Sequence, residues 1–280
     1  MTATIYEIDS SIQTPDIFKR DPVAAAMADE IYETTRGGPR TILPNSLCYV
    51  PLTEFVEPER LASLAKQMAT SDPRDIARGR RIQQAQRIGQ IEYIFDVGNW
   101  STSMPPDPDS GKAYATLLQI LQYPFSVGSI HIDPAAPMGK PFIDPQYYSG
   151  KQGFLDLEIQ QLCAHFGQRI LETPPLRDFV KNRVWPPAGV DEAELRDWIV
   201  NNTVTDWHPV GTCSMGGYEG IKAGVVDERL RVYGVRGLRV ADASIMPLQI
   251  SAHLQATVYA IAEKASVMIK EDRRSRGQMI

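Results

Sequence analysis

The sequence predicts an α+β protein, in which an antiparallel sheet packs against helices. Apolar residues recur at helical spacing in several segments, and short strand-like runs lie apart from them. Clusters of proline and glycine separate these segments as loops. The chain has 280 residues, of which 43% are hydrophobic and 22% are charged. These values are ordinary for a globular protein with one large domain or two modest ones.

Five helices are predicted from start signals and apolar stripes. Glu57-Pro58 and Asp72-Pro73 each place a proline in a first helical turn, and the second of these helices is expected to run towards Ile91. Asp191 and Glu194 have the spacing of a capping box. The stripes on the expected helices are Leu61, Leu64, Ala65 and Met68; Leu155, Ile159, Leu162, Phe166 and Ile170; Leu195, Trp198 and Ile199; and, after Ser251, Leu254, Val258, Ile261, Ala265 and Met268.

Four short runs are strand candidates, and they cover residues 115–123, 127–132, 224–227 and 238–241. The first is also compatible with a helix, because a short apolar run does not distinguish the two. The last leads through Asp242 and Pro247 directly into the final helix. This order of elements indicates an α+β architecture.

Charge and cysteine content narrow the class of protein. The 34 acidic residues exceed the 29 basic ones, which argues against a nucleic-acid partner. Cys48, Cys163 and Cys213 are odd in number and widely spaced, so we expect neither a disulfide framework nor a metal site. The N-terminus lacks the pattern of a secretory signal, and no stretch approaches the roughly 20 apolar residues of a membrane span. We therefore expect a soluble, cytoplasmic protein with no membrane partner.

Two of the four histidines are candidates for chemistry. His131 alternates with isoleucines in a strand candidate and His165 lies beside a helical stripe, so both are expected to be structural. His208 lies in a segment of loop-forming residues, 207–216, which is suited to fixing a side chain. His253 lies at the start of the final helix, where free N–H groups favour an anion. Together His208 and His253 could supply one base and one hydrogen-bond donor.

Several segments of the second half of the chain have distinctive sequences. They are WHPVGTCSMG at 207–216, GVVD at 224–227, LRVYGV at 230–235, LRVADASIMP at 238–247 and SAHLQATVYAIAEKA at 251–265, with 126–132 and 143–145 upstream. Together these segments resemble the C-terminal half of the glucose-methanol-choline (GMC) oxidoreductases. The resemblance is specific from Ser126 to the C-terminus and looser before it.

The resemblance implies two domains and an FAD cofactor. Residues 1–205 correspond to an antiparallel-sheet, substrate-binding domain with helices. Residues 206–280 correspond to the loop of the catalytic histidine and the C-terminal strand-helix remnant of a Rossmann-like FAD-binding domain. In the family, the histidine matching His208 takes the hydroxyl proton of an alcohol while hydride passes to flavin N5. The residue matching His253, which is His or Asn, hydrogen-bonds the alcohol oxygen.

The resemblance also implies contacts with the flavin. Asp242 and Ala243 correspond to the turn that meets the ribityl-pyrophosphate region, although Asp242 could instead cap the turn into Ser244. Backbone amides near His253 and Leu254 would face the pyrimidine edge of the ring. Cys213 is expected to be a packed thiol.

The sequence departs from the family in one respect, because none of its 20 glycines falls in a G-x-G-x-x-G turn. We therefore expect the pyrophosphate and adenine site to be missing, and a strand edge and an apolar helix face to be exposed. Three alternatives stay open. The chain could be a truncated or split oxidoreductase that works with a complementary FAD-binding chain. It could belong to a non-redox branch such as versicolorin B synthase, or it could be an inactive binding protein.

Overall fold

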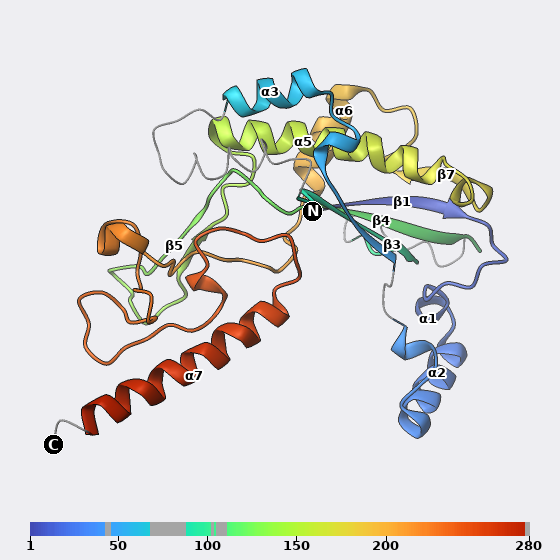
Figure 1. Ribbon diagram of the computed structural model, residues 1–280. Helices are drawn as coiled ribbons and strands as arrows, with labels where there is room; N and C mark the ends of the chain where they lie inside the picture. The colour runs from blue at the N-terminus through green and yellow to red at the C-terminus, as the bar shows by residue number, and fades with distance from the viewer. Residues whose placement is uncertain (43–45, 68–87, 102–103, 105–110, 278–280) are drawn as a thin grey trace. The chain divides into compact units, whose positions relative to one another are not determined.

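The computed structural model describes residues 1–42, 46–67, 88–101, 104 and 111–277. These residues form two compact units (Figure 1). Unit 1 contains residues 1–121 and 148–204, and unit 2 contains residues 122–147 and 205–280. Unit 2 thus includes an excursion, 122–147, that lies earlier in the sequence than the expected boundary at 205/206. The functional assignment of the two domains stays a prediction.

Unit 1 is built on a five-stranded antiparallel sheet with the strand order β2-β3-β4-β1-β7. The central strand β4 pairs on both sides, so Leu118 lies opposite Ala3 of β1 and Ile94 of β3. The combination of this sheet with helices confirms the predicted α+β class. The strands are β1 (Thr2–Ile8), β2 (Ser46–Val50), β3 (Ile91–Val97), β4 (Ala113–Leu121) and β7 (Val180–Trp185).

Helices cover one face of this sheet. Figure 1 shows α3 (Pro58–Gln67) and α5 (Gly150–Leu171) on the same side of the sheet, and an ion pair between Arg60 and Glu158 joins the two helices. Gln160 of α5 reaches the sheet and donates hydrogen bonds to Thr2 Oγ1 (2.9 Å) and the Gln119 carbonyl (3.1 Å). The face of α5 against the sheet is therefore partly polar, and its buried Gln160 amide is paired, as burial requires.

The helix α6 (Glu192–Asn202) follows the prediction closely. The Asp191 side chain accepts hydrogen bonds from the backbone of Ala193 and Glu194, and the Glu194 side chain accepts one from the Asp191 backbone. This is the predicted capping box. The predicted stripe is buried as well, and it packs with α5 in a cluster that contains Leu157, Ala164, Leu195, Trp198 and Ile199.

Several other elements differ from the sequence-based expectation. The ambiguous run at 115–123 forms a strand as far as Leu121, in β4, which begins two residues before the run. The helix expected after Asp72-Pro73 lies outside the described residues, and Ile91 itself begins a strand. The helices α1 (Ile17–Arg20) and α2 (Pro22–Thr35) were not predicted, although Asp21 caps α2 by accepting hydrogen bonds from Val23 and Ala24.

Unit 2 has little regular structure apart from one long helix. It contains the two-stranded ribbon of β5 (Ser129–His131) and β6 (Phe142–Asp144), two 3₁₀ turns (Gly217–Lys222 and Ala243–Ile245) and α7 (Gln255–Gly277). The strands expected at 224–227 and 238–241 are replaced by isolated bridges, in which Val226 pairs with Met215 and Val232, and Arg231 with Arg239. Each pairing is a single residue long, so no regular ladder forms. Among the described residues, no helix combines the length and the hydrophobicity of a membrane span.

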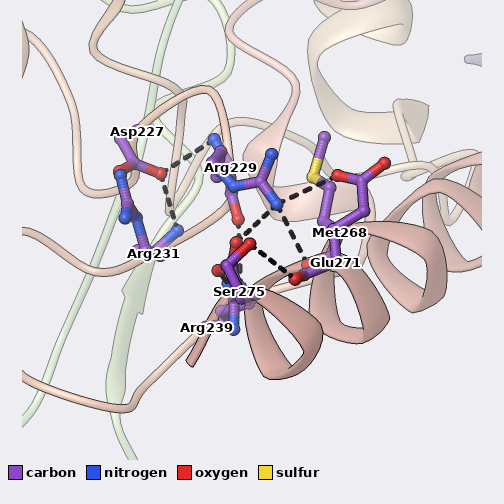
Figure 2. Close-up of polar contacts among 8 residues, drawn as sticks. Asp227, Arg229, Arg231, Arg239, Met268, Glu271 and Ser275 are labelled. Atoms are coloured by element: carbon purple, nitrogen blue, oxygen red, sulfur yellow. Dashed lines mark hydrogen bonds and ion pairs between the residues drawn. The ribbon is translucent and has the colours of Figure 1, made fainter. Parts of the chain in front are cut away.

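The helix α7 is held to these loops by apolar and ionic contacts. Its Ala265 is buried in a cluster with Val226, Leu230 and Ile245. Figure 2 shows the polar contacts, in which the Arg229 guanidinium bonds the Met268 carbonyl (3.0 Å). The ion pairs of this network join Arg229 with Glu271 and Asp272, Arg239 with Asp272, and Arg231 with Asp227. The C-terminal half of the helix is therefore fixed to the segment 227–239.

This network predicts that acid weakens unit 2. Burial by itself would raise the pKa values of Asp227 and Asp272, but hydrogen bonds from Arg231 to Asp227 and from Arg229 and Arg239 to Asp272 outweigh it and hold both pKa values below their usual range. The unfolded chain then binds more protons than the folded one, so stability is present above about pH 4 and is lost as the pH falls below it.

The measurement is urea unfolding of unit 2 between neutral and acid pH, followed by amide signals of α7. Asp272→Asn should lower the midpoint at neutral pH, and its difference from the wild type should shrink as the pH falls. A difference that is constant with pH would show that the carboxylate of Asp272 does not carry the acid sensitivity.

Candidate active site

Two loops of unit 2 run side by side and carry the candidate residues. The segment after His208 lies against the turn after Asp242, because the Cys213 and Met215 backbones donate hydrogen bonds of 3.0 Å to the carbonyls of Ser244 and Ile245. Gly211 has a φ of +87°, and a Cβ there would lie 3.3 Å from the Met246 carbonyl oxygen. A side chain is therefore disfavoured at the point where the two loops approach.

His208 is half-buried at the start of the first loop. Its Nδ1 lies 3.0 Å from Oδ2 of Asp206, two residues earlier. Trp207 between them has a φ of 54°, in the left-handed region that a bulky residue seldom adopts. This sharp turn brings the carboxylate and the imidazole to the same side of the chain.

His253 lies two residues before the first residue of α7, and its ring faces that of His208. The two ring centroids are 5.3 Å apart, with an interplanar angle of 51°. The segment before it is tied to the excursion 122–147, because the Ser251 backbone donates a hydrogen bond to the Tyr123 hydroxyl (3.1 Å). The two histidines chosen from the sequence therefore lie together, although 44 residues separate them along the chain.

The residues expected near the flavin lie in the same unit. Asp242 accepts hydrogen bonds from the backbone (2.8 Å) and hydroxyl (2.5 Å) of Ser244, which is the capping role that was considered for it. Ala243 begins the 3₁₀ turn that follows. Leu254 is buried, and its carbonyl accepts the hydrogen bond from Val258 in the first turn of α7.

The other two histidines lie elsewhere and are exposed. His131 is on the ribbon opposite Phe142, and His165 of α5 pairs with Glu192 at 3.0 Å. The three cysteines are free, and the described residues contain no group of side chains that could hold a metal ion.

Asp206 was not identified from the sequence as a candidate site residue. The available signal was a carboxylate two residues before the loop histidine, but this spacing is informative only when the intervening residue makes a tight turn. Nothing in the sequence indicates a left-handed conformation at Trp207, because that conformation is expected of glycine or asparagine.

Comparison with known proteins identifies the family. Residues 124–262, which include both histidines, match the family model for GMC oxidoreductase. The chain belongs to the GMC oxidoreductase family. This confirms the predicted family, and the matched model is that of its C-terminal domain.

One relative of this GMC chain and two solved structures of similar fold illustrate the match. The dehydrogenase mpl7 of Monascus purpureus is 31% identical over 298 residues, which cover 97% of this chain and 46% of the relative. A formate oxidase of Aspergillus oryzae, a protein with FAD, superposes with a TM-score of 0.78 at 20% identity, over 98% of this chain and 46% of that one. A fungal aryl-alcohol oxidase has a TM-score of 0.67 at 22% identity, over 98% and 48% of the two chains.

Two features of these matches, their coverage and their sequence identity, limit what they show about this chain. The chain spans about half the length of the curated relatives it matches. The two oxidase structures are less than 25% identical to it, so they establish a shared fold. Their names describe oxidases, and mpl7 is described as a dehydrogenase.

Proposed function

We propose that this chain is the substrate-side half of an FAD-dependent oxidoreductase that converts an alcohol to a carbonyl compound, with His208 as the base. The observation that carries the proposal is the pairing of His208 and His253, whose ring centroids are 5.3 Å apart at the N-terminal end of a long helix. Family relatives described as oxidases and dehydrogenases support the reaction class.

The residues present suit the ring end of a flavin. The first N–H groups of a helix have no partners within it and carry the positive end of its dipole. Those of α7 begin directly after Leu254, beside the two imidazoles. A reduced flavin ring is an electron-rich group, so this donor set fits it.

The phosphate end of FAD is suited less well. The Asp242 carboxylate is negative and is engaged with Ser244, so it offers no donor to a phosphate. The sequence has no G-x-G-x-x-G turn. We therefore propose that a complementary FAD-binding segment or chain supplies the pyrophosphate site. In support, unit 2 exposes large apolar side chains on its ribbon and on α7, among them Ile132, Phe142, Ile143 and Tyr259.

In the proposed reaction, the chain's own residues handle the proton and the orientation of the substrate. FAD, when bound, would accept the hydride from the carbinol carbon. Nε2 of His208 takes the hydroxyl proton of the alcohol, and His253 donates a hydrogen bond to the same oxygen. With its proton held by His208, the oxygen can form the carbonyl double bond as the hydride leaves.

The proposal is tested by combining the chain with a separately produced flavin-binding half of a relative such as mpl7. We expect a bound-flavin spectrum that bleaches without oxygen when an alcohol is added. His165→Gln, which changes an exposed histidine on α5 of unit 1, serves as the control and should leave the bleaching unchanged. A flavin that binds but is never reduced by any of a panel of primary, secondary and aryl alcohols would contradict the proposal. Turnover of a hydroxy-ketone without flavin would favour the non-redox alternative.

A further inference from the structure

We propose that Asp206 is a positioning residue that keeps the proton of neutral His208 on Nδ1, so that Nε2 retains the lone pair needed by a base. The inference rests on the proposed function for its catalytic meaning. The placement of the proton can be measured without a flavin, so it can be tested separately.

The first argument is the distance and charge of the pair. Nδ1 of His208 lies 3.0 Å from Oδ2 of Asp206, close enough for the charge of the carboxylate to act on the ring nitrogen. An ionised carboxylate can only accept hydrogen bonds. If Nδ1 carried the lone pair, two electron-rich atoms would face each other. The tautomer with hydrogen on Nδ1 is therefore favoured, and the second nitrogen is left free to accept a proton.

The second argument is how strongly the pair is screened by solvent. The side chains of His208 and Asp206 are 26% and 24% exposed, whereas those of the pair His165 and Glu192 are 47% and 72% exposed. Water and salt weaken an exposed pair more than a half-buried one. The charge of Asp206 should therefore be screened less from its histidine than the charge of Glu192 is from His165.

The third argument is the backbone that joins the two residues. The contact depends on the left-handed turn at Trp207, a residue that is 71% exposed and so is not placed there by burial. Unfavourable backbone conformations persist when the surrounding structure fixes them, and they cluster at functional sites. The turn has a clear local effect, which is to bring the Asp206 carboxylate to the His208 ring.

The proposed tautomer of His208 also suits the neighbouring imidazole of His253. His253 provides the neighbouring ring, at a centroid distance of 5.3 Å. With its proton on Nδ1 beside Asp206, His208 presents Nε2 as an acceptor, and His253 can act as the donor to the same substrate oxygen. A base and a donor on one oxygen is the combination that the oxidation of an alcohol needs.

The test is ¹⁵N NMR of the histidine side chains in the full chain, at about pH 9, where an ordinary imidazole is neutral. The four histidines are assigned from single His→Gln variants. In the wild type, we expect the shifts of His208 to report a protonated Nδ1 and an unprotonated Nε2. In Asp206→Asn, the population with hydrogen on Nε2 should rise, because the charge that held the proton is gone.

The matched control is Glu192→Gln, which removes the carboxylate beside His165 and should leave the His208 signals unchanged. Asp206→Glu should restore much of the wild-type tautomer, and it serves if the Asn variant does not fold. A wild-type His208 with hydrogen on Nε2, or His208 shifts that are the same in all Asp206 variants, would overturn the inference.

Kinetics of the enzyme assembled with a flavin-binding half provide the second measurement. We expect Asp206→Asn to lower kcat on the order of 10²-fold with little change in KM, because a wrong tautomer removes the base without removing substrate contacts. If the alcohol reaction fails altogether but the tautomer shift is seen, the inference holds and the proposed function is wrong. If the assembled enzyme oxidises alcohols but the tautomer of His208 is the same in Asp206→Asn as in the wild type, the proposed function holds and the inference is wrong.

Discussion

His208→Ala should lower the rate of flavin reduction by alcohol roughly 10²- to 10⁴-fold, which is the usual contribution of a general base. The variant removes the acceptor of the hydroxyl proton, so the carbinol carbon must lose its hydride while the oxygen still holds its proton. We expect the loss in kcat, since His253 is left to bind the alcohol oxygen. The measurement is single-turnover bleaching of the flavin in the assembled enzyme.

The control for this variant is His165→Ala, which removes an exposed imidazole from α5 in unit 1. His165 pairs with Glu192 on the surface, so its loss should change neither the rate nor the fold by a measurable amount. The amide spectrum of His208→Ala should keep the signals of α7, because the core of that helix is formed by residues such as Val226 and Ala265. A rate within a few-fold of the wild type would mean that another group takes the proton.

The parts of the fold that the sequence predicts are those with local signals. The capping box at Asp191 and the stripe of α6 depend on residues within two helical turns of one another, so they can be recognised without knowing the fold. The same holds for α3 and for α7, whose apolar residues repeat along one face.

The parts that the sequence does not predict depend on distant residues. The strand β1 was missed, because its polar Thr2 and Thr4 break the apolar pattern, and their hydroxyls are paired in the folded chain with Gln119 and Gln160. The strand expected at 224–227 is replaced by isolated bridges at Val226. A regular ladder needs partner strands, and the sequence of this segment does not reveal whether such partners exist.

The candidate site divides in the same way. His208 and His253 were chosen from their loop and helix-start contexts, and their proximity is a property of the fold that the resemblance anticipated. Asp206 was not chosen, because its role depends on one backbone angle at Trp207. Its contact with His208 therefore had to be observed.

The second large effect is expected for Ile199→Ala in α6. The Ile199 side chain is fully buried in the cluster between α5 and α6, so the variant loses its transfer free energy and leaves a cavity. Such substitutions cost about 2–5 kcal/mol. The neighbour Val200 on the same helix is 48% exposed, so Val200→Ala should change the free energy of unfolding by less than about 0.5 kcal/mol.

The comparison of these two variants tests the orientation of the helix. Both remove a β-branched side chain, so the gain in helix propensity from alanine is similar in each, and the difference reports burial. Urea unfolding followed by the amide signals of unit 1 is the measurement. Equal destabilisation would mean that α6 is rotated from its assigned position or that the α5–α6 cluster does not form. A large difference would establish that Ile199 faces α5 and that this packing stabilises the helix beyond its capping box.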